Sequence, residues 1–414
     1  MQRGPVAVLR HVVLDELSAG LVEKLDAGSA AFINSSGLAR VSPLGMGLYR
    51  VEPCGKVGSV RTSTLQLDVR PKDRLGLERL LFMLSYSGEP GFRDDDIHAA
   101  AAPELWSALA DSLAQLAERA LSRGVLQGYL TVEESLRTVK GRIRISDQIS
   151  RRPGMLVPLE VSHDEFSPDI AENRILRAAL ERMAQVPAVR PDVLSRLRQL
   201  KGKLDGVTRL PSGAPLPQWS PDRRNVRYHA VLRLAGLILR NASAEAGEGG
   251  ERAASFVVDM AEVFRDFVGA ALRGALSAYP GDTRLGFNAL LNEAVEDSDR
   301  LSVTPDAVHF LGGRPVVVYD ARYAARTDAG ATLSGDHYRM LAYCTALQVP
   351  TAWLVYSGAG EIKLRRVLNT DIDIVEFPLD LSLPPSEILA AVADLAGQSW
   401  GEVLRQVRLG ELGG

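Results

Sequence analysis

The sequence predicts a multidomain α+β protein with a β-rich N-terminal module, a mainly helical middle module and a C-terminal α/β module. A chain of 414 residues is too long for one ordinary hydrophobic core. Short β-type runs with Gly and Pro punctuation come first, helical periodicity follows, and helical and strand patterns then alternate. We therefore predict modules over residues 1–75, 76–245 and 251–400.

The N-terminal module is predicted to be all-β. Short β-type runs occupy residues 30–37, 39–45, 47–55 and 56–72, separated by Gly and Pro. In the last run apolar and polar residues alternate from Leu65 to Arg70, so the apolar side chains share one face of a strand. Period two of this kind is typical of β-strands and supports the all-β prediction.

The middle module begins with helical periodicity at residues 75–87 and continues through residues 104–126. One segment interrupts it, because Lys140, Arg142 and Arg144 fall on every second residue. A strand there would present them as a basic stripe on one face. Such a stripe fits contact with phosphate or with an acidic partner, and it equally fits an exposed strand with solubilising charges.

Two signals delimit the later helices of this module. Ser167 and Pro168 supply an N-cap residue and a proline at the first helical position, which predicts a helix start there. Residues 241–255 are small, Gly-rich and polar, and they separate two helical patterns. We therefore predict the domain boundary within that segment.

The C-terminal module is predicted to be a sheet layered by helices. Its pattern is a helix, a hairpin of two strands around a Gly-Gly turn, a helix and two more strands. In chain order these are a helix at 255–279, strands at 301–311 and 314–324, a helix at 335–347, a strand at 351–358 and a strand near 361–368.

Composition excludes several protein classes. The 48 basic and 51 acidic residues give a net charge of -3, which by itself does not predict a nucleic-acid partner. Cys54 and Cys344 lie far apart with no CxxC spacing, which argues against a disulfide framework or a zinc site and favours the cytoplasm. The first residues lack a signal-peptide pattern, and the longest apolar stretch, 231–239, is too short to span a bilayer. We expect no membrane association.

Two carboxylates in the predicted hairpin form the main candidate site. Asp306 follows a proline at the end of one strand, and Asp320 ends the next apolar strand. Paired carboxylates on adjacent strands are what a Mg²⁺ site for phosphodiester hydrolysis needs, because oxygen ligands hold the ion that activates water. Aspartates at strand ends also serve commonly as turn formers, so the pair alone does not establish a site.

Several ordered motifs make the chain resemble the McrC family of 5-methylcytosine-specific restriction subunits. KVGSVRTSTLQLDVRPKDRLGLERLLFMLSYS is similar to the family's N-terminal signature, and LTVEESLRTVKGRIRI to its EE-x-L...GRI segment. HDEFSPDIAENRILRAAL and DRRNVRYHAVLRLA are similar to its next two helices, and TPDAVHF with VVVYDARY to its nuclease core. The resemblance implies a C-terminal PD-(D/E)xK restriction-endonuclease-like fold.

The same resemblance implies a division of labour. A family member binds a hexamer of an McrB-like AAA+ GTPase, stimulates its GTP hydrolysis and contributes the endonuclease for double-stranded DNA carrying modified cytosine. The chain has no GxxxxGK[ST] phosphate loop, so we expect it to bind no nucleotide itself. Lys140, Arg142 and Arg144 are candidate partner contacts, and Mg²⁺ is the expected cofactor if the nuclease site is active.

Three positions depart from the family's catalytic pattern. Arg322 stands where the family has the lysine of D-x-K, and arginine cannot give up a proton at accessible pH. Arg265 stands at the glutamate position of the preceding helix, although Glu262 one turn earlier could supply a carboxylate. Tyr338 and Arg339 stand where the family has Tyr-Gln.

These departures leave three hypotheses. In the first, the chain activates a GTPase but cuts DNA weakly or not at all, with the arginines and Tyr338 binding DNA and the aspartates paired to arginine instead of metal. In the second, it is an active Mg²⁺-dependent endonuclease in which Asp306, Asp320, Arg322 and Glu262 are catalytic. In the third, it is a DNA-binding or scaffold protein whose aspartates are turn residues. The first two hypotheses differ in whether the chain cleaves DNA in the presence of a metal ion. The third differs from both in that no GTPase partner binds.

Overall fold

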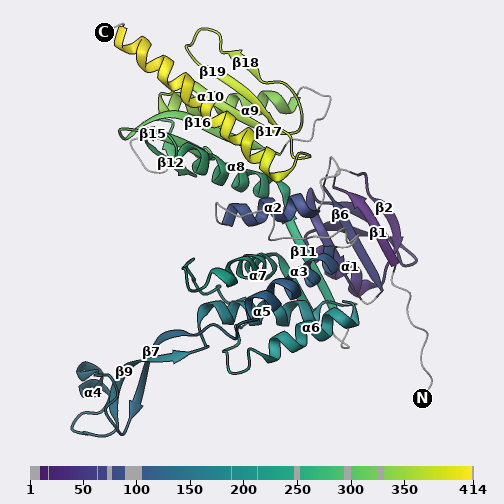
Figure 1. The fold of residues 1–414 in the computed structure, drawn as a ribbon. Coiled ribbons are helices and arrows are strands. Elements are labelled where there is room, and N and C mark those ends of the chain that lie inside the picture. Colours follow the sequence, from purple (N-terminus) through teal and green to yellow (C-terminus); the bar gives the residue numbers. More distant parts are fainter. Residues whose placement is uncertain are drawn as a thin grey trace. The chain divides into compact units, whose positions relative to one another are not determined.

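The computed structural model shows two compact units (Figure 1). It describes residues 10–16, 18–62, 64–71, 77–88, 105–187, 189–211, 213–246, 252–292, 300–323 and 331–412. The division into three modules stays a prediction. Contacts within the chain group its residues into two units. One unit comprises Met1–Val60, Thr64–Ala99 and Val257–Gly414, and the other comprises Arg61–Ser63 and Ala100–Phe256.

The first unit contains the predicted N-terminal strands. Leu65, Leu67 and Val69 lie in a buried core, which confirms the predicted alternation in that strand. The opposite face is buried as well, since Gln66 and Asp68 are almost inaccessible to solvent, and the Asp68 carboxylate accepts a hydrogen bond of 2.5 Å from the Ser59 hydroxyl. The strands are β1 (Arg10–Asp15), β5 (Lys56–Arg61) and β6 (Leu65–Arg70) in one sheet, and β2 (Leu21–Lys24), β3 (Ala39–Gly45) and β4 (Leu48–Pro53) in another.

The all-β prediction for this region was wrong at one element. Residues 30–37, read as a β-type run, belong to helix α1 (Ala27–Ser36) and its C-cap. The Asp26 carboxylate caps the helix by accepting from the Ser29 backbone N–H at 2.7 Å, and Gly37 ends it at a φ of 70°. Local capping therefore outweighed the apparent strand pattern.

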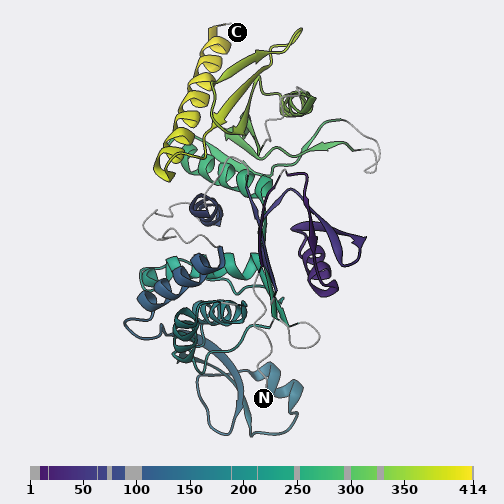
Figure 2. The same cartoon turned by 90° about the vertical axis from the view of Figure 1, so that its right-hand side faces the viewer.

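The C-terminal part of this unit is a six-stranded sheet in the order β12-β15-β16-β17-β19-β18. Figure 2 shows α9 on one face and α8 with α10 on the other. The side chains of β16 alternate accordingly, since Val318 packs in the α9 core while the Tyr319 hydroxyl lies 2.5 Å from Ser399 of α10. The elements are α8 (Met260–Leu276), β12 (Asp282–Leu285), β15 (Ala307–Leu311), β16 (Arg314–Arg322), α9 (Ala331–Leu347), β17 (Thr351–Ser357), β18 (Lys363–Arg366), β19 (Asp373–Leu379) and α10 (Pro385–Leu412).

Most C-terminal elements were predicted, and the corrections are local. The hairpin β15–β16 turns at Gly312 and Gly313, both with positive φ, as predicted. The helix expected at 255–279 begins only at Met260, because Asp259 caps it and β11 (Arg252–Asp259) precedes it. Strands β12 and β19 and helix α10 were not predicted.

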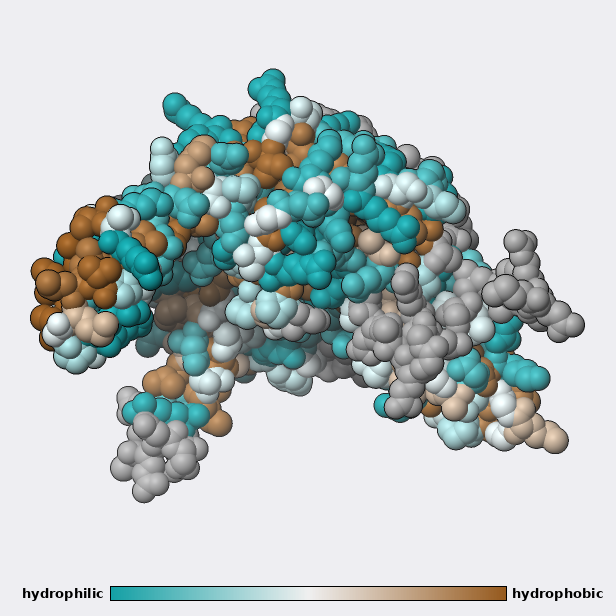
Figure 3. Space-filling model, turned by 90° about the horizontal axis from the view of Figure 1, so that it is seen from below, coloured by the Kyte–Doolittle hydropathy of each residue, from teal (hydrophilic) through white to brown (hydrophobic). Residues whose placement is uncertain are grey.

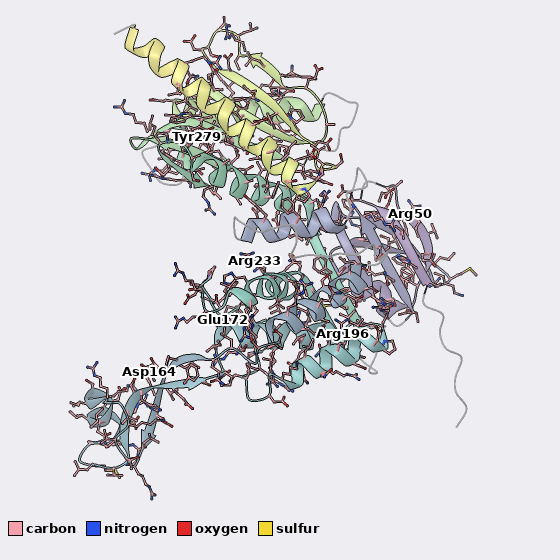
Figure 4. The ribbon with its side chains drawn as sticks, viewed as in Figure 1. Arg50, Asp164, Glu172, Arg196, Arg233 and Tyr279 are labelled. Carbon is pink, nitrogen blue, oxygen red and sulfur yellow. The ribbon has the colours of Figure 1, made fainter. Side chains whose placement is uncertain are left out.

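The second unit is a cluster of helices, as the periodicity predicted. Arg196, labelled in Figure 4, donates two hydrogen bonds of 2.8 and 2.9 Å to Glu118 of a neighbouring helix. The predicted boundary segment 241–255 contains strand structure, because β10 (Ala242–Ala246) pairs antiparallel with β11. Residues 247–251 of this segment lie outside the described part of the chain. The same is true of Lys72, the last residue of the β-type run predicted over 56–72. The helices are α3 (Leu105–Ala120), α5 (Ala171–Gln185), α6 (Pro191–Gly202) and α7 (His229–Asn241).

An arm projects from these helices (Figure 1). Its shaft is the antiparallel pair β7 (Gly128–Leu136) and β9 (Leu159–Ser167), and its tip carries β8 (Arg142–Ile143) and α4 (Ile145–Arg151). The predicted helix start at Ser167-Pro168 was wrong by about one turn, because the ladder continues to Ser167 and α5 begins at Ala171.

Candidate functional site

The hairpin brings Asp306 and Asp320 to one end of the sheet. Asp306 directly precedes β15, and Asp320 lies near the end of β16, whose Tyr319 is paired with Ala307. The Asp306 carboxylate accepts a hydrogen bond of 2.8 Å from the Ala321 backbone N–H. The two predicted carboxylates therefore share one site, and the backbone of β16 holds one of them in place.

Asp320 is buried without a hydrogen-bond donor. Its exposed fraction is 0%, and neither carboxylate oxygen accepts a hydrogen bond. The Arg322 Nη2 atom lies 2.5 Å from Asp320 Oδ2, so the contact is an ion pair that lacks hydrogen-bond geometry. Burial, together with the neighbouring Asp306 charge, raises the pKa of Asp320 to about 8, although Arg322 opposes the shift.

Helix α9 completes the charged cluster with Asp336 and Arg339. The Arg322 Nε–H donates to Asp336 Oδ1 at 3.2 Å. Arg339 Nη1 lies 3.9 Å from Asp320 Oδ2 and 3.7 Å from Asp336 Oδ1. Sequence reasoning missed Asp336, although its i, i+3 spacing from Arg339 on a predicted helix was a usable signal.

Helix α8 contributes a different carboxylate from the one expected. Glu262 in the first turn and Asp266, four residues later, are both exposed, but Asp266 is close enough to Asp306 for the two charges to interact. Partial desolvation raises the pKa of Asp266, and the charges of Glu262 and Asp306 raise it further against the opposing effect of Arg265. The i, i+4 spacing from Glu262 was the signal for Asp266 that the sequence offered.

The remaining predicted DNA contacts lie at the edge of the cluster. Tyr338 is 72% exposed, and the Arg339 side chain is 44% exposed. Next to them His337 Nε2 lies 2.8 Å from Glu376 Oε1 of β19, which also pairs with Arg365 of β18. The arginines near the cluster are therefore largely matched by carboxylates, and Tyr338 and Arg339 are the predicted contacts that solvent reaches most.

The arrangement does not fit a Mg²⁺ ion. Within the described residues no group of three or more His, Cys, Asp or Glu side chains is arranged to hold a metal. Asp306 and Asp320 bring two carboxylates together, but the Arg322 guanidinium lies against the Asp320 oxygen that would ligate the ion. Because Mg²⁺ requires oxygen ligands in near-octahedral geometry, a cation and this guanidinium compete for one position. The magnesium expectation stays conditional on an active nuclease site.

The predicted basic stripe on the arm is not formed as a strand face. Only Arg142 lies in the two-residue β8, and Lys140 precedes it in a loop; both are exposed. Arg144 is the N-cap residue of α4 and pairs with Glu133 at 2.9 Å and with Asp147. Gly141 explains the break, because its φ is +72° and a Cβ there would meet the Ser162 carbonyl at 2.4 Å.

The tip of the arm carries an exposed apolar patch that sequence reasoning did not identify. Figure 3 shows it as the brown end of the molecule at the left. Leu156 is 84% exposed, and its neighbours are at least half that exposed. We call this set the tip patch; it consists of Val139, Ile145, Ile149, Met155, Leu156 and Val157.

Comparison with known proteins points to one family. Residues 51–357 match the family model described as McrBC 5-methylcytosine restriction system component. A chain in the refined half-complex from the tetradecameric assembly of Thermococcus gammatolerans McrB AAA+ hexamers with bound McrC has a similar fold. It is 17% identical with a TM-score of 0.58, over 95% of this chain and 100% of that one.

A second solved structure is less similar. A chain in the cryo-EM structure of the Thermococcus gammatolerans McrBC complex matches with 18% identity and a TM-score of 0.41, over 66% of this chain and 90% of that one. No curated protein matches the chain. No helix in the described part is both long enough and apolar enough to cross a membrane.

Proposed function

Since the chain belongs to the family of McrBC 5-methylcytosine restriction system components, whose model matches residues 51–357 of its 414, we propose that it is the McrC-like subunit of a DNA restriction complex. Its partner is an McrB-like AAA+ GTPase hexamer, whose GTP hydrolysis it stimulates. The observation that carries the proposal is the extent of the family match. It includes the helical unit, the whole arm and the hairpin that bears Asp306 and Asp320.

The tip of the arm is the proposed contact with the GTPase. An apolar patch rimmed by polar residues marks a protein interaction surface more often than chance exposure does. The tip patch is bordered by Lys140 and Arg142, whose charges are available because no carboxylate among the described residues forms an ion pair with them. Apolar contact would supply affinity, and the two cations would select an acidic counter-surface.

The tip is tested by changing Leu156 to Asp and measuring GTP hydrolysis by the partner. We expect stimulation to fall by about tenfold or more, because a charge would have to be buried at the contact. Leu368→Asp is the matched control, since Leu368 is 86% exposed and lies on the other unit. Equal losses in both variants, or full stimulation by the Leu156 variant, would contradict this assignment.

For the C-terminal sheet we propose a PD-(D/E)xK-like nuclease domain with a degenerate active site. Arg322 replaces the lysine that would orient or polarise the attacking water, and a permanently charged guanidinium cannot exchange a proton in that role. Arg265 replaces the glutamate, while Asp306 and Asp320 keep their positions. Arg339 and Tyr338 at the exposed edge would contact the phosphate backbone of double-stranded DNA, consistent with their accessibility.

The decisive experiment combines the chain with its GTPase partner on plasmid DNA, methylated at cytosine or unmethylated, with Mg²⁺ or Mn²⁺. We expect stimulated GTP hydrolysis on intact DNA. Cleavage that Asp320→Ala abolishes would show instead an active endonuclease in which Arg322 substitutes for lysine. Absence of any stimulation would remove the proposed partnership itself.

A further inference from the structure

We propose that Arg322 is the resident cation of the nuclease-type site, that Asp336 positions it there, and that together they exclude a divalent ion. The inference rests on the proposed nuclease-type fold of this domain. It does not depend on whether the chain binds a GTPase. Its subject is the cluster of Asp306, Asp320, Arg322 and Asp336, which we call the carboxylate cluster.

Asp320 requires a positive charge nearby. Its side chain is 1% exposed, and neither of its oxygens accepts a hydrogen bond. A buried carboxylate without donors is unfavourable unless a cation or a proton compensates it. In a metal-dependent site this compensation comes from the ion, whereas here the nearest positive charge is Arg322 Nη2 at 2.5 Å.

The shape of the Arg322 guanidinium group lets it contact two carboxylates at once. Arg322 contacts Asp320 through Nη2 and donates through Nε to Asp336, so the two carboxylates hold different edges of one planar group. Lysine has a single compact ammonium that cannot present two separated donor edges in this way. The substitution of arginine for lysine therefore changes which group occupies the centre of the site.

The arginines nearly balance the negative charge of the site without a metal ion. Asp306, Asp320 and Asp336 supply three carboxylates, and Arg322 and Arg339 supply two guanidinium groups within 4 Å of Asp320 or Asp336. A divalent ion beside Asp320 would face the fixed positive charge of Arg322 in a poorly solvated site, where like charges repel strongly. Entry of the ion requires displacement of the guanidinium, and the Asp336 contact opposes that displacement.

The proposal is tested by measuring Mn²⁺ binding to the full-length chain by titration calorimetry and electron paramagnetic resonance, without DNA or partner. We expect no Mn²⁺ binding to wild type that depends on Asp320. Arg322→Ala should gain one site, with an affinity for Mn²⁺ at least about tenfold above the weakest binding that the titration of wild type would detect, and Asp336→Asn should gain a weaker form of it. Adding Asp320→Asn to Arg322→Ala should abolish the gain.

Arg366→Ala is the matched control, because Arg366 pairs with Asp373 in the same sheet at 3.0 Å but on an exposed surface. It should gain no Mn²⁺ site. If circular dichroism shows that Arg322→Ala does not fold, Arg322→Lys provides the test, since the ammonium cannot hold both carboxylates. Asp320-dependent binding by wild type, or a folded Arg322 variant without a new site, would overturn the proposal. GTPase stimulation, measured separately, would be unaffected by either result.

Discussion

Asp169 in one unit and Asp320 in the other each lie beside an arginine, but they differ in their hydrogen bonds and in the direction of their pKa shifts. Asp169, just before α5, accepts hydrogen bonds of 2.9 and 2.7 Å from Arg174 and two of 2.6 Å from Thr208. These bonds, led by those of Arg174, lower its pKa to about 2. Asp320 has an arginine at 2.5 Å but no hydrogen-bond donor, and burial raises its pKa to about 8.

The difference separates a carboxylate whose oxygens all accept hydrogen bonds from a buried carboxylate that has only an ion pair. Around Asp169 every oxygen is satisfied, so the ionised form is stable and ties α5 to the loop at Thr208. Around Asp320 a charge is buried and only partly compensated, which natural proteins tolerate mainly where function required it. The presence of an arginine beside an aspartate therefore does not by itself distinguish a structural carboxylate from a functional one; the hydrogen bonds that the carboxylate accepts make the distinction.

The largest expected effect is that of Arg322→Ala on stability. Removing the partner leaves Asp320 buried and uncompensated, and breaking a buried ion pair on one side costs about 3–5 kcal/mol. Urea unfolding at pH 9, followed by circular dichroism, would measure this. Adding Asp320→Asn should restore most of the loss, because the charge disappears with its partner; an additive double variant would show that the two residues act independently.

A smaller effect is expected for Asp169→Ala. The substitution removes four hydrogen bonds, but Arg174 is 33% exposed and can be solvated, so we expect a loss of about 2–3 kcal/mol in the free energy of unfolding. Asp222→Ala is the control, because its pair with Arg224 is exposed to solvent and should contribute little to stability. If Asp169→Ala and Asp222→Ala lower the free energy of unfolding equally, the hydrogen bonds of Asp169 contribute no more to stability than an exposed ion pair does.

The sequence predicted the fold best where the local pattern and the packing agree. Apolar alternation from Leu65 to Val69 and the Gly312-Gly313 turn were both confirmed. Residues 30–37 were misread because the capping by Asp26 and Gly37 lies outside the run itself. Strand β19 and helix α10 went unpredicted, since their burial depends on a sheet assembled from distant segments.

The site was predictable in its members but not in its pairing. Spacing placed Asp306 and Asp320 in one hairpin, yet no local pattern shows that Arg322 contacts Asp336, 14 residues further along the chain. The motif residues that carry the family resemblance proved to have structural contacts. Asn173 is fully buried and donates to the Leu126 and Pro168 carbonyls, and Gly141 is required by its backbone conformation.

The two aspartates predict opposite dependences of stability on pH. Asp169 has a folded pKa of about 2 against an ordinary value of 3.8, so its contribution is fully present above pH 4 and is lost as the pH falls through 2. That loss amounts to about 2 kcal/mol. Asp320 has the opposite sign: its raised pKa favours the folded state at low pH, and this contribution is lost as the pH rises through about 8.

Urea midpoints between pH 2 and pH 9 would measure both dependences. Asp169→Asn should flatten the acid side only, below about pH 4, and Asp320→Asn should flatten only the side between about pH 4 and pH 8. If both variants change the same side, the two carboxylates do not differ in the way that their hydrogen bonds imply.

The smallest effect expected is that of Asp336→Asn on stability. Asp336 touches Arg322 at 3.2 Å and Arg339 at 3.7 Å, but both arginines keep contact with Asp320, so the loss should be about 1 kcal/mol or less. The informative result is the combination with Asp320→Asn. If Asp336 only adds a surface ion pair, its substitution will cost the same in wild type and in the Asp320→Asn background. If Asp336 positions Arg322 for the buried carboxylate, the cost measured by urea unfolding will shrink once Asp320→Asn removes the charge that Arg322 compensates.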